Sequence, residues 1–298
     1  MRKIIKCALI KGLLHLLALL PLPITYSIAT RLGQIMGSWQ TLRITQVTHT
    51  NIHLCFPQLS PTTQKRLVKK SLIETCKTFS ELGALWLWQN DRVLRLVQKV
   101  SGETYLQQAL QKGKGVILLT PHLGAWELAG LYASAHYPLT ALYRPPKLQG
   151  LHDLIHAART RTGGRFVATD KTGVRALYYA LRRGQIVGIL PDQVPSETGS
   201  GIFVPFFEVQ TYTMVLVSRL ARKTGATVIF TFAERLSTQA GFHIHFLQAP
   251  AKMATDNLEM SVSALNQGIE KCVRKNPTQY QWSYKRFKRR PEGVASVY

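Results

Sequence analysis

The pattern of hydrophobic and polar positions changes near residue 100. Before that point apolar residues recur at helical spacing, and the longest such stretch runs from Ser60-Pro61 to about Trp88. Beyond Gly102, short apolar and β-branched runs alternate with amphipathic segments, which predicts strands alternating with helices. We therefore expect an α/β fold: one domain with a central, mostly parallel sheet flanked by helices, preceded by an N-terminal membrane-associated helical segment.

The expected elements of the α/β part follow from apolar runs bounded by glycine, proline and polar residues. Strands are predicted at 115–120, 139–143, 166–167, 186–190, 226–234 and 242–247. Helices are predicted at 104–111, from 125 onward, and at 148–161, 172–183, 211–223 and 256–275. The sequence shows no internal repeat, low-complexity linker or clear second domain.

The N-terminus combines cations with a leucine-rich run. The basic residues Arg2, Lys3, Lys6 and Lys11 precede and interrupt it, and the uncharged part, 12–24, is shorter than the ~20 residues that span a bilayer. This pattern favours an uncleaved anchor at 1–28 that lies in, or just crosses, an anionic leaflet. A signal peptide and an ordinary core helix are the alternatives. The rest, 29–298, is then the main domain, helical over 29–100 with an α/β core at 101–298.

Charge restricts the partners of this chain. Its 298 residues include 38 Lys and Arg against 15 Asp and Glu, a formal net charge of +23, with 46% hydrophobic residues. Such a chain selects nucleic acid, an anionic membrane or phosphorylated substrates. No helix-turn-helix, zinc-finger or RRM signature supports nucleic acid. The four cysteines are widely scattered, which is typical of a reducing compartment and supplies no paired metal spacing.

The stretch 114–130, KGVILLTPHLGAWELAG, carries the candidate chemistry. Its strand ends at Pro121, and His122 and Glu127 follow around a glycine-containing turn. Side chains five apart on one helix point in different directions, so these two meet only if His122 precedes the helix and Glu127 begins it. A carboxylate that holds one imidazole nitrogen leaves the other free as a general base. An H-x4-E spacing also arises by chance, and two ligands are too few for catalytic zinc, so no metal is expected.

Three predicted strand ends carry polar residues: His122, Arg144 and Asp192. The carboxyl ends of strands in open α/β sheets line one crevice, so these residues are expected to converge on a site. Asp192 follows Pro191 and is alternatively the first residue of a turn.

Several blocks resemble a known family. They are the stretch TNIHLCFPQLS at 50–60, PHLGAWE at 121–127, YRP at 143–145, LPDQ at 190–193, VPFF at 204–207 and PTQYQW at 277–282. In order and spacing they are similar to the lysophospholipid acyltransferase superfamily, and within it to the late lipid A acyltransferases of Gram-negative bacteria. Thr227 departs from the pattern, since the family often has proline there.

The resemblance implies a mechanism and a location. His122 would deprotonate an acceptor hydroxyl, Glu127 would orient His122, and the hydroxyl would attack the thioester of an acylated carrier protein directly, without metal, cofactor or acyl-enzyme. The acceptor would be a 3-hydroxyacyl chain on a phosphorylated, Kdo-bearing lipid A precursor. The protein would act at the cytoplasmic face of the cell inner membrane and bind no nucleic acid.

The resemblance also suggests substrate-binding roles for residues outside the His-Glu pair. Arg144 would bind acceptor phosphate or support the site, as would Arg159 and Arg161, although cations also simply favour helix C-termini. Asp192 would support the site, and Phe206 would line the acyl pocket unless it packs in the core. The alternative functions are an acyltransferase for another glycolipid or lysophospholipid, a basic protein that binds nucleic acid or membrane, and an inert membrane scaffold.

Overall fold

The computed structural model describes residues 2–146, 148–195, 197, 199–236 and 241–298. The helices are α1 Arg2–Leu19, α2 Leu22–Ser38, α3 Arg43–Cys55, α4 Pro61–Leu87, α5 Asn90–Leu94, α6 Glu103–Gln111, α7 Trp126–His136, α8 His152–Thr160, α9 Lys171–Arg182, α10 Leu216–Thr224 and α11 Leu258–Lys275. The strands are β1 Val97–Ser101, β2 Val116–Leu119, β3 Leu139–Tyr143, β4 Arg165–Ala168, β5 Ile186–Ile189, β6 Gly201–Phe206, β7 Val209–Met214, β8 Thr227–Arg235 and β9 Phe242–Gln248.

The described residues form a seven-stranded central sheet in the order β1-β9-β8-β2-β5-β3-β4. Every neighbouring pair is parallel except β8 and β9, which are antiparallel. This confirms the predicted α/β fold with a mostly parallel sheet. The consequence for the site is that β2 and β5 are neighbours although about 70 residues separate their ends in sequence, because βαβ crossovers place later strands beside earlier ones.

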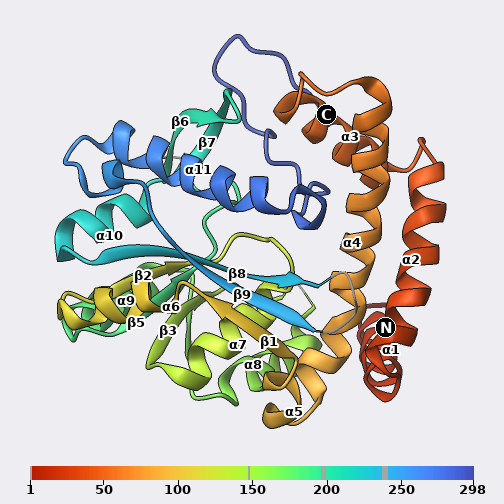
Figure 1. Cartoon of the computed structure of the whole chain (residues 1–298), viewed down its shortest axis with the longest axis horizontal. Helices are drawn as coiled ribbons and strands as arrows, with labels where there is room; N and C mark the ends of the chain where they lie inside the picture. Colours follow the sequence, from red (N-terminus) through yellow and green to blue (C-terminus); the bar gives the residue numbers. More distant parts are fainter. Residues whose placement is uncertain (1, 147, 196, 198, 237–240) are drawn as a thin grey trace.

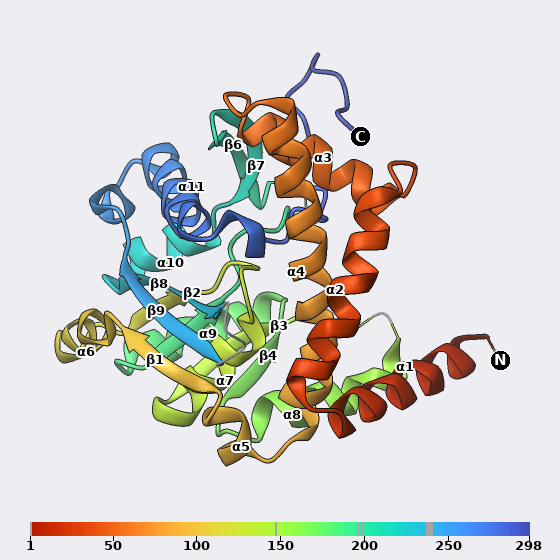
Figure 2. The same ribbon diagram turned by 45° about the vertical axis from the view of Figure 1, so that its right-hand side comes forward.

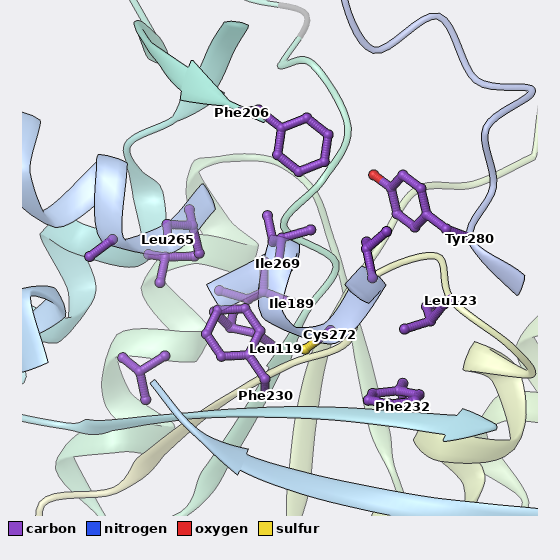
Figure 3. Close-up of a cluster of buried hydrophobic side chains, with 14 of the residues drawn as sticks. Leu119, Leu123, Ile189, Phe206, Phe230, Phe232, Leu265, Ile269, Cys272 and Tyr280 are labelled. Carbon is purple, nitrogen blue, oxygen red and sulfur yellow. The ribbon is translucent and has the colours of Figure 1, made fainter. Parts of the chain in front are cut away.

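Helices cover both faces of this sheet, and α10 and α11 lie on the side opposite α7 (Figure 1). Alternate residues of each buried strand face opposite sides, so Ile117 and Leu119 pack with α9, α10 and α11, while Val116 and Leu118 pack with α6 and α7. Figure 3 shows the first of these cores, where Leu119 and Phe230 of the sheet lie beneath side chains of α11. Burial on both faces explains why β2 and β5 are continuous apolar runs.

The N-terminal helices stand beside the sheet, with α4 between α2 and the α/β core (Figures 1 and 2). A buried ion-pair network ties α4 to the end of β8: Arg235 donates from Nε and Nη2 to both oxygens of Glu81, and from Nη1 to Glu74 at 2.6 Å. Helix α1 extends away from the body toward the N-terminus (Figure 2). Among the described residues, no helix has both the length and the apolar composition that a membrane crossing requires.

Three strands correct the sequence-based expectations, one at the edge of the sheet and two in a hairpin. Residues 97–101 form the edge strand β1 although the region to residue 100 was expected to be helical, because its polar residues Gln98 and Lys99 hide the strand pattern. Residues 201–206, for which no strand was predicted, form β6, and residues 211–214, expected to begin a helix, complete β7. The two strands pair as an antiparallel hairpin. Phe207 and Glu208 form the turn between the two strands, and both have positive φ. Hairpin turns with positive φ usually contain glycine or asparagine, so this sequence did not predict a hairpin.

Candidate active site

His122 and Asp192 meet at the carboxyl ends of two adjacent strands. His122 follows β2 and Asp192 follows β5, and these strands pair in parallel register up to Leu119 and Ile189. The His122 ring Nδ1 lies 2.7 Å from Asp192 Oδ1, and the His122 backbone N–H donates to Asp192 Oδ2 at 2.8 Å. The carboxylate therefore fixes both the ring and the backbone of the histidine.

The other nitrogen of the His122 ring faces a polar group. The Gln193 side-chain amide lies 3.1 Å from His122 Nε2, and the Trp126 ring packs at a tilt with its centroid 5.0 Å from that of the imidazole. An ionised carboxylate only accepts hydrogen bonds, so the neutral ring carries its proton on Nδ1 and donates it to Asp192. Nε2 then accepts from the Gln193 amide, and this is the nitrogen that a base requires.

Asp192 is held in the ionised state. Burial by itself raises the pKa of this carboxyl. The His122 ring, the His122 backbone N–H and the Arg286 guanidinium lower it by more than burial raises it, so the pKa lies below its ordinary value. The side chain is only 2% exposed, which keeps water from competing for its two hydrogen bonds to His122.

Glu127 does not occupy the position expected from the sequence, where it was to orient His122. It lies in the first turn of α7, and Arg159 of α8 donates to both of its oxygens, from Nε at 2.9 Å to Oε2 and from Nη2 to Oε1. Trp86 Nε1 donates to Oε2 at 3.1 Å. The α8 helix brings a guanidinium within reach of the buried carboxylate, and Asp192 supplies the carboxylate at the imidazole instead.

The Glu127–Arg159 pair is charged on both sides. Burial raises the pKa of Glu127, yet Arg159, the Trp86 hydrogen bond and the electrostatic attraction of His122 together bring that pKa below its ordinary value. Burial lowers the pKa of Arg159, and the attraction of Glu127 more than offsets this. Glu127 thus acts on His122 through space, without the direct hydrogen bond that Asp192 makes.

His122 opens into a cavity of about 760 Å³. Charged residues of the wall include Glu127, Arg144, Arg159 and Lys171. Apolar residues of the wall include Leu118, Leu131, Leu139, Ala141, Leu142, Phe166, Val174, Ile189, Met214 and Leu216. One cavity therefore offers an imidazole, cations and a long apolar lining, and its volume lies within the ~300–1,000 Å³ typical of ligand sites.

Two residues expected to bind substrate lie elsewhere. Arg161 donates to the backbone carbonyls of Leu85, Trp86 and Trp88 at the end of α4, where the exposed carbonyls of a helix attract a cation. Phe206 is fully buried in the core, packed against other aromatic rings, and is not among the residues lining the cavity. In the structure, Arg161 therefore binds the end of α4 and Phe206 packs in the core.

Gln193 and Trp86 were not anticipated as part of the site. Gln193 directly follows Asp192, so the convergence of strand ends could have indicated it. Trp86 lies near the end of α4, and its contact with Glu127 depends on how α4 packs beside α7, which no local pattern reveals.

The model of the bacterial lipid A biosynthesis acyltransferase family matches residues 2–289. The chain belongs to this family. It is 28% identical to a lipid A biosynthesis lauroyltransferase of Escherichia coli over 288 residues, which is 96% of this chain and 92% of the other. It shows the same identity and coverage to a palmitoleoyltransferase of that organism, and 26% identity to a lipid A biosynthesis acyltransferase of Haemophilus influenzae over 94% of this chain and 86% of the other.

Membership of the lipid A acyltransferase family makes this protein an acyltransferase. The family match includes α1 to α5 as well as the sheet, so the N-terminal helices lie within the matched region.

Proposed function

We propose that this protein transfers a fatty acyl chain from the thioester of an acyl-carrier protein to a hydroxyl of a 3-hydroxyacyl chain on a lipid A precursor. The supporting observation is His122 at the cavity, with Nδ1 bound to buried Asp192 and Nε2 directed at a hydrogen-bond donor. An imidazole held this way accepts a hydroxyl proton, and the family carries out acyl transfer in lipid A biosynthesis.

The proposed reaction uses one imidazole for two proton transfers. The acceptor hydroxyl displaces the Gln193 amide from His122 Nε2 and gives its proton to that nitrogen as its oxygen attacks the thioester carbon. The carbon–sulfur bond then breaks, and the imidazolium returns the proton to the departing thiolate. The products are an ester and a free thiol, and no acyl-enzyme forms.

The two carboxylates have different tasks in this scheme. Asp192 keeps the proton on Nδ1 and stabilises the imidazolium through the 2.7 Å hydrogen bond. Glu127 adds negative charge near the ring and holds Arg159, which forms part of the cavity wall. Catalysis therefore depends on both, although only Asp192 touches the base.

The cavity fits an acyl chain next to an anionic head group. The apolar lining would receive the chain, and Arg144 and Lys171, both exposed and at the cavity, would contact phosphates of a Kdo-bearing precursor. No metal or cofactor takes part in the proposed scheme. The net charge of +23 favours the same anionic partners.

A membrane-facing surface completes the proposal. We define the α1–α2 apolar face as the exposed large apolar residues Ile4, Ile5, Leu9, Leu13, Leu16, Leu19, Ile24, Ile28, Leu32, Ile35 and Trp39. Lys3 and Lys6 are exposed beside it. An apolar helical face flanked by lysines suits an anionic bilayer surface, so this face would rest in the cytoplasmic leaflet of the inner membrane. The anchor would then extend past residue 28, with the remainder forming the acyltransferase domain.

The direct test is acyl transfer from an acylated carrier protein to a Kdo-bearing lipid A precursor, with products read by mass spectrometry. The wild type should add one acyl chain, and His122→Ala should be slower by about 10²- to 10⁴-fold. His136→Ala, a histidine of α7 outside the cavity lining, is the matched control and should keep the wild-type rate. A fully active His122→Ala variant refutes the mechanism. Acylation of another glycolipid or a lysophospholipid alone refutes the acceptor.

A further inference from the structure

A second group of ligating side chains lies on the sheet, separate from the cavity. Glu234 of β8 pairs directly with His243 of β9, and His245, two residues along the same strand, points to the same face. In the described part of the chain, one nitrogen or oxygen from each of these three residues lies within 4.8 Å of the others. Two imidazoles and a carboxylate are a known ligand set for zinc, in which a water molecule takes the fourth position.

The three side chains are already oriented by their neighbours. His245 Nε2 lies 2.8 Å from Glu234 Oε2, and its ring stacks on Phe232 at a centroid distance of 4.6 Å. The second Glu234 oxygen accepts from the Asn276 amide at 3.0 Å. Partners of this kind hold metal ligands in place and limit the entropy lost on binding.

The remaining histidine is also held in place. His243 Nε2 lies 2.8 Å from Ser101 Oγ of β1, and its ring centroid lies 3.8 Å from that of His245. The His245 and Glu234 side chains are 12% and 25% exposed, so an ion can reach them from solvent. The three side chains therefore lie on the paired strands β8 and β9, and Ser101 of β1 contacts one of them.

We propose that Glu234, His243 and His245 form a binding site for a divalent transition-metal ion of the zinc type. Tetrahedral zinc with bonds of 2.0–2.2 Å places its ligand atoms about 3.4 Å apart, so the most widely separated of the three ligand atoms need to approach one another by at most about 1.4 Å. Binding replaces the His245–Glu234 hydrogen bond, and the ring proton moves to the other nitrogen or to solvent. Magnesium and calcium, which prefer oxygen ligands, are excluded by the two imidazoles.

The surrounding charges set the expected strength. Lys99 and Lys275 act electrostatically on His243 and oppose a cation, while Glu234 is the one carboxylate of the set. Binding is therefore expected to be weaker than at a four-ligand structural zinc site. The ion would tie β8 to β9 next to Ala233, whose carbonyl accepts from the Ala125 backbone N–H just after the His122 turn.

The test is titration of the full-length, metal-stripped protein, prepared without a histidine tag, with zinc chloride in a calorimeter. Glu234→Gln, His243→Gln and His245→Gln should each weaken binding by about 10- to 100-fold. His49→Gln, an exposed histidine of α3, is the matched control and should bind as the wild type does. Cobalt should give visible absorption bands in the wild type that the three variants lose, and magnesium should produce no heat.

Several outcomes would overturn the proposal. They are the absence of zinc binding by the folded wild type, affinity unchanged in all three variants, and dependence on only one of the three residues. Circular dichroism verifies that each variant is folded, and three separate substitutions of partly exposed side chains prevent one unstable variant from deciding the matter. Because the readout is metal binding, the result is independent of whether the acyl-transfer proposal holds.

Discussion

Replacement of Asp192 by asparagine tests the hydrogen-bond geometry of the site. Asp192 accepts two hydrogen bonds from His122, one from the ring and one from the backbone. Asparagine has one oxygen and one NH₂ group, so it can accept only one of them. If its oxygen keeps the backbone N–H, its NH₂ faces the ring, and Nδ1 must then accept while the proton moves to Nε2. In the opposite orientation, the NH₂ faces the backbone donor.

Each arrangement has a cost. With the proton on Nε2 the ring cannot accept the hydroxyl proton, and a comparable Asp-to-Asn change in a serine protease triad costs about 10⁴ in kcat. With the other arrangement a buried backbone N–H loses its acceptor, at about 1–3 kcal/mol of stability. We expect Asp192→Asn to slow acyl transfer by about 10²- to 10⁴-fold.

The assay is single-turnover transfer to the lipid A precursor, with thermal unfolding measured in parallel. The ¹⁵N chemical shifts of the His122 ring report the tautomer directly and should show the proton on Nε2 in the variant if the rate loss has the proposed cause. A merely structural role would lower the melting temperature without changing the tautomer. A wild-type rate in folded Asp192→Asn would refute the assignment of Asp192 as the positioning residue.

Four further outcomes are expected. Glu127→Gln leaves the partly buried Arg159 beside a neutral group, so the free energy of unfolding should fall by about 3 kcal/mol in denaturant titrations. Arg159→Gln in the same chain should restore part of it. Because the pKa of Glu127 is depressed in the folded state, the stabilisation that ionised Glu127 gives the fold is complete above the ordinary carboxyl range and is lost as pH falls below about 4. Glu127→Gln should therefore lose less stability than the wild type as pH falls, and an identical acid unfolding curve would contradict this. Ala141→Leu fills the cavity beside Gly188 and should lower the rate with long donors relative to short donors by about tenfold, as measured by competition between donor chain lengths; an unchanged ratio would place the acyl chain elsewhere. Leu9→Asp with Leu13→Asp should weaken co-sedimentation with phosphatidylglycerol vesicles by about tenfold or more, and undiminished binding would exclude α1 from the membrane contact.

Local pattern predicted much of the fold because the strands concerned are buried on both faces. The runs at β2 and β5 are apolar throughout and end at proline, so their existence and their ends were readable. Edge strand β1 and hairpin strands β6 and β7 were missed, since burial there is partial and their polar residues obscure the strand pattern. The information that fixes them is tertiary, because β1 pairs with β9, and β6 and β7 pair with each other.

In the site, too, some features follow from local sequence and others depend on tertiary packing. The meeting of His122 and Asp192 was foreseeable from the rule that strand ends converge. The choice of Asp192 over Glu127 as the partner of the ring was not, because it depends on where α8 places Arg159. Spacing in sequence brought Glu127 near the base, but the position of Arg159 decided that Glu127 binds the guanidinium and not the ring.

The end of α4 links the proposed lipid-facing helices to the cavity. Trp88 donates from Nε1 to the Ala18 carbonyl at the end of α1, and two residues earlier Trp86 donates to Glu127 in the cavity wall. Arg161 binds the carbonyls of the same turn, which fixes this turn to α8 and so to the helix that carries Arg159. On the proposed orientation, the distance of His122 from the membrane is therefore set by side-chain hydrogen bonds at one helix end. A lipid acceptor that keeps its chains in the leaflet would then reach the base at only one position along its length. In this way a rigid link between anchor and site would select the hydroxyl that is acylated.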